Sequence, residues 1–238
     1  MPASGMTMDF ERFEILTFDC YGTLIDWEAG ILAALRPVLD RHGVTMGDDA
    51  ILERYGAAES AVQGGDFLPY ADVLRHVMDR LAEQSGITLV AGERDALVDS
   101  IGRWPAFPDT AGALRALKKR YRLVVVSNID DDLFARTAPN LGVEMDDVIT
   151  ALQVRSYKPA PAHFERILER TGARKDGVLH VAQSLFHDIA PARALGFATV
   201  WVNRRAGRAG GGATPRAEAR PDLEVPDLAS LVRLVERT

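Results

Sequence analysis

Polar side chains follow the ends of several apolar segments of this chain. In "ILTFDCYGTL", an apolar run ends at Asp19, and Thr23 follows four residues later. The sequence thus delivers a carboxylate to the end of a buried segment, with a hydroxyl close behind it. The later apolar segments are also followed by groups that can do chemistry, namely a hydroxyl and an amide, an ammonium, and a second carboxylate with polar neighbours: Ser127 and Asn128, then Lys158, then Gln183, Ser184 and Asp188.

Each of these groups also has an ordinary structural interpretation. Asp19 could cap a helix or form a turn, and Lys158 could be solvated. Ser127 and Asn128 could be turn residues. Asp188 is expected to be the N-cap of its helix, a role that does not exclude chemistry. Because ligands bind beyond the carboxyl ends of parallel strands, the coincidence of polar groups at four strand ends favours one shared site.

The elements that must position these groups alternate between strands and helices. Short apolar segments predict buried strands at 13–18, 122–128, 147–151, 177–182 and 198–203. Helical patterns lie between them: one capped by Asp109, one ending near Ala138, and two over 159–172 and 188–195. This alternation predicts an α/β fold with a parallel sheet and right-handed crossovers.

The segment from about 28 to 103 has helical patterns and no convincing strand. Asp26 is a candidate N-cap for the first helix, and further helices are expected over 48–63, 68–86 and 91–102. We therefore predict a core domain of residues 1–27 and 104–238 with an inserted all-helical domain of residues 28–103. The glycine-rich segment 204–221 is predicted to be a flexible surface loop rather than a phosphate cradle, because no helix pattern follows it.

Composition excludes several classes of function. The formal net charge of -6 over 238 residues disfavours general nucleic-acid binding. Cys20 is the only cysteine, so an intrachain disulfide and a cysteine zinc cluster are excluded. The N-terminal segment lacks the apolar core of a signal peptide, and no apolar run could cross a bilayer. We expect a cytoplasmic protein with a small-molecule substrate and no nucleic-acid or membrane partner.

The segments "DCYGTL", "SN", "YKP" and "QSLFHD", in this order, resemble the four motifs of the haloacid dehalogenase superfamily. The resemblance spans nearly the whole chain. It implies a Rossmann-like core, a helical cap at 28–103, and Asp19 as a nucleophile that forms a covalent ester with the substrate.

Two chemistries occur in this superfamily, and the first motif distinguishes them. Its phosphatases carry a second acid two residues after the nucleophile, where this chain has Tyr21. Their fourth motif supplies Gly-Asp to magnesium, where this chain has Ala182 and Gln183, which is a poor ligand set. The resemblance is therefore to the L-2-haloacid dehalogenases, whose first motif reads Asp-x-Tyr-Gly-Thr-Leu and which use no metal or cofactor. Halide leaves as a stable anion, so no acid is needed for it.

This resemblance implies roles for the nucleophile and for the groups that bind substrate. Asp19 attacks C2 of a small 2-haloacid while Lys158 and Thr23 orient its carboxylate. The substrate carboxylate is expected at Ser127 and at the backbone amides of Cys20 and Tyr21.

The remaining roles concern halide and water. Halide is expected at Asn128 and at a cap arginine, for which Arg54 is the first candidate and Arg75 the second. The hydrolytic water is expected at Asp188, with Ser184 and Gln183.

The chain departs from the dehalogenase pattern at two places. The family reads Ser-Ser-Asn before its last aspartate, where this chain reads "AQSLFHD", and the family tyrosine after Lys-Pro corresponds to Phe164. His187 could act as a base but is expected to face the cap or solvent. Two alternatives stay open: a phosphatase or other hydrolase with a degenerate metal site, and a non-catalytic protein that binds a metabolite or partner. A homodimer is possible.

Overall fold

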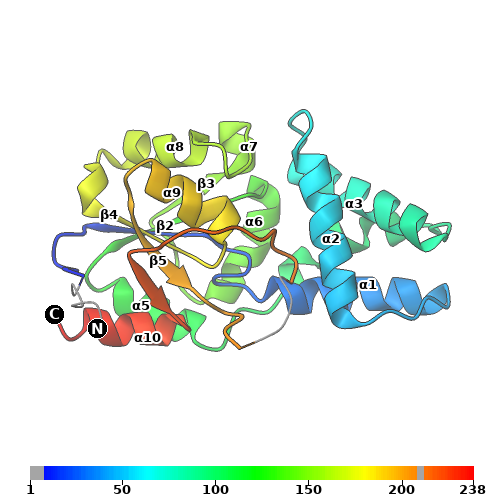
Figure 1. The fold of residues 1–238 in the computed structure, drawn as a ribbon, viewed down its shortest axis with the longest axis horizontal. Helices are drawn as coiled ribbons and strands as arrows, with labels where there is room; N and C mark the ends of the chain where they lie inside the picture. Colours follow the sequence, from blue (N-terminus) through cyan, green and yellow to red (C-terminus); the bar gives the residue numbers. More distant parts are fainter. Residues whose placement is uncertain (1–7, 208–211) are drawn as a thin grey trace.

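The computed structural model describes residues 8–207 and 212–238 and shows a parallel six-stranded sheet with helices on both faces (Figure 1). The strand order is β3-β2-β1-β4-β5-β6. The strands are β1 (Ile15–Phe18), β2 (Arg122–Ser127), β3 (Asp147–Thr150), β4 (Val178–Ala182), β5 (Ala198–Val202) and β6 (Leu223–Val225). The predicted α/β fold with a parallel, Rossmann-like sheet is confirmed.

The central strand β1 is buried on both faces of the sheet. Ile15 packs into one hydrophobic cluster, whereas Leu16 and Phe18 pack into the other. Such a strand is apolar at nearly every position, which is why the sequence pattern is a run rather than an alternation. The strand order reverses between β1 and β4, and a crevice forms where such a sheet reverses.

Helices of the sheet domain follow the strands as the alternation predicts. They are α5 (Thr110–Leu117), α6 (Asp131–Thr137), α7 (Ala151–Val154), α8 (Ala162–Thr171), α9 (Ala190–Ala194) and α10 (Leu228–Val235), with short turns η3 (Ala138–Leu141), η4 (Lys175–Gly177) and η5 (Leu185–Ile189).

The expectation that no helix follows segment 204–221 is wrong. Asp227 caps α10 by accepting a hydrogen bond from the Ser230 amide at 2.6 Å, and Leu228 and Leu231 are buried. Asp109 precedes α5, but its carboxylate does not cap that helix; it accepts from the Leu228 amide at 2.7 Å. The Asp109 carboxylate thus binds an amide far away in the sequence rather than the nearby amides at the start of α5.

Four helices and two short turns form the segment between β1 and α5. They are α1 (Trp27–Arg41), α2 (Asp48–Gln63), α3 (Tyr70–Ser85), η1 (Glu93–Asp95), α4 (Ala96–Ser100) and η2 (Ile101–Arg103). In Figure 1 the helices α1, α2 and α3 lie together, beside the sheet domain. Asp26 caps α1 by accepting from the Ala29 amide at 3.1 Å.

Two contacts fasten the start of α3 to the sheet domain. The Asp130 carboxylate accepts from the amides of Tyr70 and Ala71 at 2.8 and 2.9 Å, so it caps α3 from another part of the chain. The Tyr157 hydroxyl donates to the Leu68 carbonyl at 2.8 Å.

The prediction of a flexible surface loop over 204–221 is wrong for part of the described segment. Ala213 is fully buried, and the Thr214 hydroxyl donates to Gln183 Oε1 at 3.2 Å. A Cβ at Gly56 on α2 would lie 2.3 Å from the Ala213 oxygen, so the absence of a side chain permits this approach. Residues 208–211 of this loop, and residues 1–7 of the N-terminal segment expected not to be a signal peptide, lie outside the described residues.

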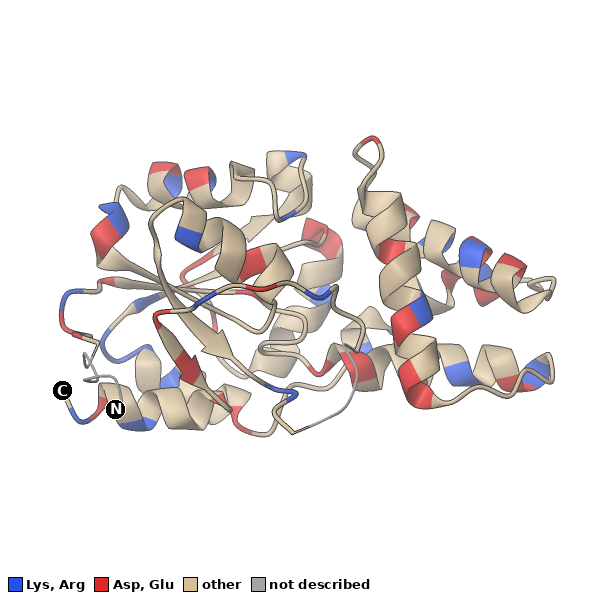
Figure 2. Cartoon of the chain, viewed as in Figure 1, with Lys and Arg blue, Asp and Glu red and all other residues tan. Residues whose placement is uncertain are grey.

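Acidic and basic residues are interspersed along the helices (Figure 2). Within residues 8–207 and 212–238, no helix has both the length and the apolar character needed to cross a membrane.

Candidate active site

Asp19 follows the end of β1 and is held from two sides. Thr23 Oγ1 donates to Asp19 Oδ2 at 2.7 Å and accepts from the Gln183 amide at 2.9 Å. Because the amide proton occupies one side of the Thr23 oxygen, the hydroxyl proton points at Asp19. The carboxylate is therefore oriented before any substrate arrives.

The turn after Asp19 depends on Gly22, which has φ of +94°. A Cβ at Gly22 would lie 3.0 Å from Trp27 Nε1, so another residue would be both strained and crowded. The turn leaves the backbone amides of Cys20 and Tyr21 without a hydrogen-bond acceptor among the described residues. Two adjacent free amides beside the Asp19 carboxylate can bind an anion.

Lys158 lies between two carboxylates beneath the pocket. It is 1% exposed, and its Nζ donates to Asp19 Oδ1 at 3.0 Å, to Asp188 Oδ1 at 2.7 Å and to the Val126 carbonyl at 2.8 Å. All three ammonium protons are thus used. The lysine offsets the charges of both acids and fixes their separation.

Asp188 is buried, and only one of its two carboxylate oxygens has hydrogen-bond partners among the described residues. Its Oδ1 accepts from Lys158 and lies 3.0 Å from His180 Nε2, whereas its Oδ2 has no hydrogen-bond partner among the described residues. His180 is in turn held by Thr17 Oγ1, 2.8 Å from its Nδ1. A buried carboxylate oxygen without a partner can accept a proton from a water molecule.

The three charged groups shift one another's pKa values. Burial raises the pKa of Asp19, Lys158 opposes the rise, and Asp188 adds to it. Burial opposes ionisation of Asp188, but Lys158 and His180 outweigh burial and lower its pKa. Burial also opposes the charge on Lys158, yet Asp188 and Asp19 outweigh burial and raise its pKa. Asp188 is therefore the stronger acid of the two and remains a carboxylate at neutral pH.

Ser127 and Asn128 follow β2, and both border the pocket. The Asn128 side chain accepts from the Lys158 amide at 2.7 Å and donates to the Lys158 carbonyl at 3.1 Å. The structure thus uses Asn128 to hold the backbone of Lys158. The Ser127 side chain makes no hydrogen bond to a described residue and is available to a ligand.

The segment after β4 is a π-helical turn, η5, and the expectation that Asp188 caps its helix is wrong. Ser184 caps the turn instead by accepting from the His187 amide at 2.8 Å, which leaves Asp188 free to bind Lys158. His187 borders the pocket, and burial lowers its pKa to about 4, so its imidazole is neutral at neutral pH.

Tyr21 stands where a phosphatase has its second acid. Its hydroxyl pairs with Thr137 Oγ1 at 2.7 Å, and its ring meets Trp104 edge to face. Burial raises the pKa of Tyr21 well above its ordinary value. The phenol is therefore a weak proton donor and a poor substitute for a carboxylic acid.

The pocket combines residues of the sheet domain with residues of the helical segment. From the sheet domain and its loops come Asp19, Tyr21, Ser127, Asn128, Lys158, Gln183, Ser184, His187, Asp188 and Thr214. From the helical segment come Trp27, Glu59, Gln63 and Tyr70. Every predicted site residue therefore borders or supports one pocket, except the two arginine candidates, Arg54 and Arg75.

Arg54 does not reach this pocket, and the expectation that it does is wrong. It is exposed on α2 and borders a separate apolar cavity with Leu35 and Met78. Arg75, the second candidate, pairs with Asp72 and Asp95. No arginine among the described residues lines the pocket.

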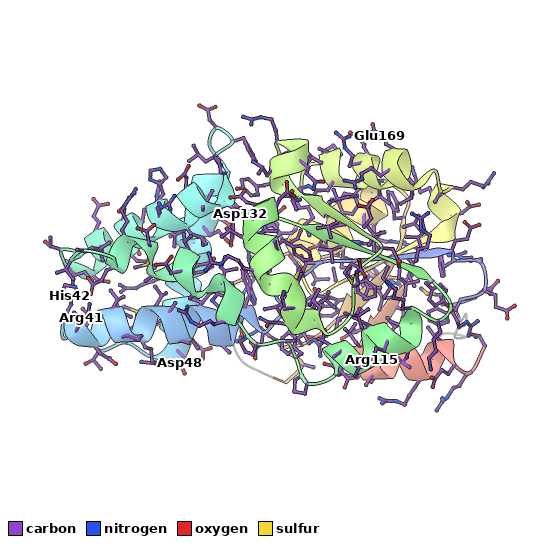
Figure 3. The ribbon with its side chains drawn as sticks, turned by 180° about the vertical axis from the view of Figure 1, so that it is seen from behind. Arg41, His42, Asp48, Arg115, Asp132 and Glu169 are labelled. Carbon is purple, nitrogen blue, oxygen red and sulfur yellow. The ribbon has the colours of Figure 1, made fainter. Side chains whose placement is uncertain are left out.

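Two further basic residues lie away from the sheet domain. Figure 3 shows Arg41 and His42 at the end of α1 that points away from that domain. Both contact Glu93, with Arg41 Nη1 at 2.7 Å and His42 Nε2 at 2.9 Å.

The donor set does not fit magnesium. Asp19 and Asp188 are the two carboxylates on the floor of the pocket, which is the side formed by the sheet domain. Lys158 forms an ion pair with each of them. No group of three or more His, Cys, Asp and Glu side chains in the described part of the chain is placed to hold a metal ion. Magnesium prefers several oxygen ligands in octahedral geometry.

Sequence reasoning missed His180, Glu59 and Tyr70. The signal for His180 was present, because Thr17 and His180 are polar residues in otherwise apolar strands and lie opposite each other in register. Phe164, matched to a family tyrosine, is fully buried 5.2 Å from the His180 ring and belongs to the core.

Comparisons of the sequence with known proteins find dehalogenases that match nearly the whole chain. The haloacetate dehalogenase H-2 of Moraxella sp. (strain B) is 27% identical over 231 residues, which cover 94% of this chain and 99% of that protein. The (S)-2-haloacid dehalogenase of Pseudomonas sp. (strain YL) is 26% identical and covers 93% of this chain and 94% of that protein.

A solved structure shows the same fold. The L-2-haloacid dehalogenase from Xanthobacter autotrophicus with chloropropionic acid covalently bound superposes with a TM-score of 0.77 at 22% identity, covering 94% of this chain and 98% of that one. The family model of haloacid dehalogenase-like hydrolases matches residues 13–196, which include all four polar strand ends. This chain therefore belongs to the haloacid dehalogenase-like hydrolases.

Proposed function

We propose that this protein hydrolyses small 2-haloacids to 2-hydroxy acids through a covalent ester on Asp19. The observation that carries the proposal is Tyr21, which occupies the position of a leaving-group acid and has a pKa raised by burial. An alkoxide leaving group needs a proton, whereas halide does not. The curated relatives named as haloacetate and 2-haloacid dehalogenases support the same chemistry.

In the first step an Asp19 carboxylate oxygen attacks C2 of the substrate. A carbon–oxygen bond forms, the carbon–halogen bond breaks, and halide leaves with the bonding electrons. Lys158 and Thr23 hold the carboxylate in place. The Ser127 hydroxyl and the amides of Cys20 and Tyr21 bind the substrate carboxylate.

In the second step water attacks the carbonyl carbon of the Asp19 ester. Asp188, through its unpaired Oδ2, takes a proton from this water. As the bond between the acyl carbon and the alcohol oxygen breaks, Asp188 returns this proton to the alcohol oxygen, so the 2-hydroxy acid leaves as a neutral alcohol. The second proton of the water leaves the Asp19 carboxyl for solvent, which regenerates the Asp19 carboxylate. Ser184 and Gln183 border the same pocket as Asp188 and orient the water.

Residues 28–103 serve as a cap domain over a core of 1–27 and 104–238. Two observations support this division: the insert is helical throughout its regular elements, and Glu59, Gln63 and Tyr70 from it line the pocket. A cytoplasmic location and a possible homodimer stay predictions.

A paired turnover assay tests the proposal. One arm follows halide release from (S)-2-chloropropionate with a chelator present, and the other follows phosphate release from an aryl phosphate with excess magnesium. We expect halide release, its loss in Asp19→Asn, and no phosphate release. Phosphate release without halide would establish the phosphatase alternative instead, and an activity that survives Asp19→Asn would remove Asp19 as nucleophile.

A further inference from the structure

Glu59 is a buried carboxyl group that the dehalogenase chemistry above does not use. It is 4% exposed, lies on α2 and borders the pocket opposite the floor formed by the sheet domain. Buried acids are uncommon, and one beside a substrate pocket is a candidate functional group.

The two oxygens of Glu59 have different surroundings. Oε1 accepts from the Tyr70 hydroxyl at 2.5 Å and from the Tyr55 hydroxyl at 3.1 Å. Oε2 makes no hydrogen bond to any residue in the described ranges. When Glu59 carries a proton, that proton therefore belongs on Oε2, because Oε1 is already occupied by two donors. A protonated Glu59 thus offers one O–H group to the pocket.

The charges of the pocket favour the protonated form when an acid binds. Lys158 is the one cation among the described lining residues, and it faces the two carboxylates Asp19 and Asp188. None of the described lining residues is an arginine that could balance an incoming anion. An ionised Glu59 beside an anionic ligand would add like charges in a buried place, which is costly.

Resting on the proposed function, we infer that Glu59 acts in its protonated form as the hydrogen-bond donor to an anionic group of the substrate, so that binding of the acid is coupled to uptake of one proton. The donor takes the place of the cap arginine that is missing from the described lining of this pocket. The anionic group is either the carboxylate or the departing halide, because both accept a hydrogen bond from a neutral acid.

Glu59 titrates near neutral pH, where the coupling between anion binding and proton uptake can be measured. Burial raises the pKa of Glu59 to about 7, although hydrogen bonds from Tyr70 and Tyr55 oppose the rise. Above this pH the free protein therefore holds ionised Glu59. An anion can then bind only after Glu59 has taken up a proton. Affinity for an anion is therefore expected to fall about tenfold for each pH unit above the pKa.

The other titratable groups that face Glu59 change their protonation little near neutral pH. They are Tyr55 on α2, Tyr70 on α3, Tyr157 between α7 and α8, and across the pocket Asp19, Lys158, His187 and Asp188. Burial raises the pKa of each of the three tyrosines, and it lowers that of His187 to about 4. The pKa of Lys158 is raised and that of Asp188 is lowered. Asp19 also has a raised pKa, so the experiment is run with Asp19→Asn as well as the unchanged protein.

Calorimetric titration tests the inference without turnover. Propionate probes the carboxylate and bromide probes the halide, each in buffers of different ionisation enthalpy between about pH 6 and about pH 9. We expect proton uptake to approach one per bound anion at the alkaline end for one of these probes. Glu59→Gln keeps a donor but cannot titrate, so its uptake should vanish and its affinity should be independent of pH.

Two further variants make the result specific. Glu53→Gln removes the same charge from an exposed position on α2 and should behave like the unchanged protein. Tyr70→Phe removes a bond that favours ionised Glu59, so the midpoint of the affinity loss should move to higher pH even if Glu59→Gln does not fold.

The inference is overturned if proton uptake is absent for both probes or persists in Glu59→Gln. It is also overturned if ethylammonium binds better as the pH rises, because ionised Glu59 would then select a cation. Halide release by the unchanged protein is measured separately, so a failure of this inference is distinguishable from a failure of the dehalogenase proposal.

Discussion

Replacing Asp188 by Asn should separate the two steps of the proposed reaction. Asn keeps the shape of Asp188 and an oxygen for Lys158, but it cannot take a proton from water. Loss of a positioned base slows a step by about 10²–10⁴-fold, or roughly 3 to 5 kcal/mol in barrier height. Attack by Asp19 needs no base, and removal of the neighbouring charge lowers the pKa of Asp19, so the first step should be largely retained.

The expected result for Asp188→Asn is one rapid equivalent of halide per protein, followed by slow release. Intact-mass spectrometry after reaction with (S)-2-chloropropionate should show one propionate ester, and peptide mapping should place it on Asp19. The control is Asp132→Asn, which removes an exposed carboxylate from α6 (Figure 3) and should turn over normally.

Two outcomes for Asp188→Asn would refute this reasoning. Steady halide release at the unchanged rate would show that Asp188 is not the base for ester hydrolysis. A folded variant that releases no halide, even in a single turnover, would show that Asp188 is needed for attack at carbon.

Three further predictions follow from the same contacts. Lys158→Met leaves two buried carboxylates without a counter-charge. In urea titrations it should lower the free energy of unfolding by about 3 to 5 kcal/mol. The control Lys119→Met, at an exposed position, should leave the free energy of unfolding unchanged. Asp130→Ala removes the cap of α3 and should cost about 1 kcal/mol and raise KM for the haloacid, because α3 carries Tyr70; an unchanged KM would argue against this link. Halide release should fall with decreasing pH at a midpoint above 3.8, since burial raises the pKa of Asp19 and the protonated acid cannot attack; a midpoint below 3.8 in the kcat/KM profile would contradict this.

Part of the floor of the site was predictable because Asp19 and Ser127 lie at the ends of strands. A buried parallel strand has a recognisable apolar pattern, and the residue after it lies at the carboxyl edge of the sheet. Lys158 is different, because α7 lies between the end of β3 and this residue. Proximity in space followed from topology, without any knowledge of side-chain contacts.

The turn after β4 was less predictable, because long-range bonds decide it. Asp188 follows a strand and could cap a helix, but Lys158 and His180 bind its carboxylate instead, and Ser184 takes the capping role. Local propensity describes the competing helix cap and contains nothing about Lys158, which lies thirty residues earlier in the sequence.

The cap side of the pocket was mispredicted for a geometric reason. Arg54 and Glu59 are five residues apart on α2, and at 3.6 residues per turn they point about 140° apart. Only one of them can face the pocket, and helix periodicity alone does not say which. The four-residue spacing from Tyr55 to Glu59 places these two on one face, and the buried Tyr55 marks that face as the inner one.

The rotation of α2 therefore determines which charge the cap presents to the substrate. With Arg54 inward, the pocket would hold a permanent cation and bind an acid over a wide pH range. With Glu59 inward, it holds a group that can be neutral or anionic near pH 7, so the same floor binds an acid only when that group is protonated. The proposed nucleophile Asp19 and the proposed base Asp188 lie in segments that follow strands of the sheet, so they are independent of this choice. Chemistry and substrate affinity are thus encoded in different parts of the chain, and a change confined to α2 could alter affinity for acids while leaving Asp19, Lys158 and Asp188 in place.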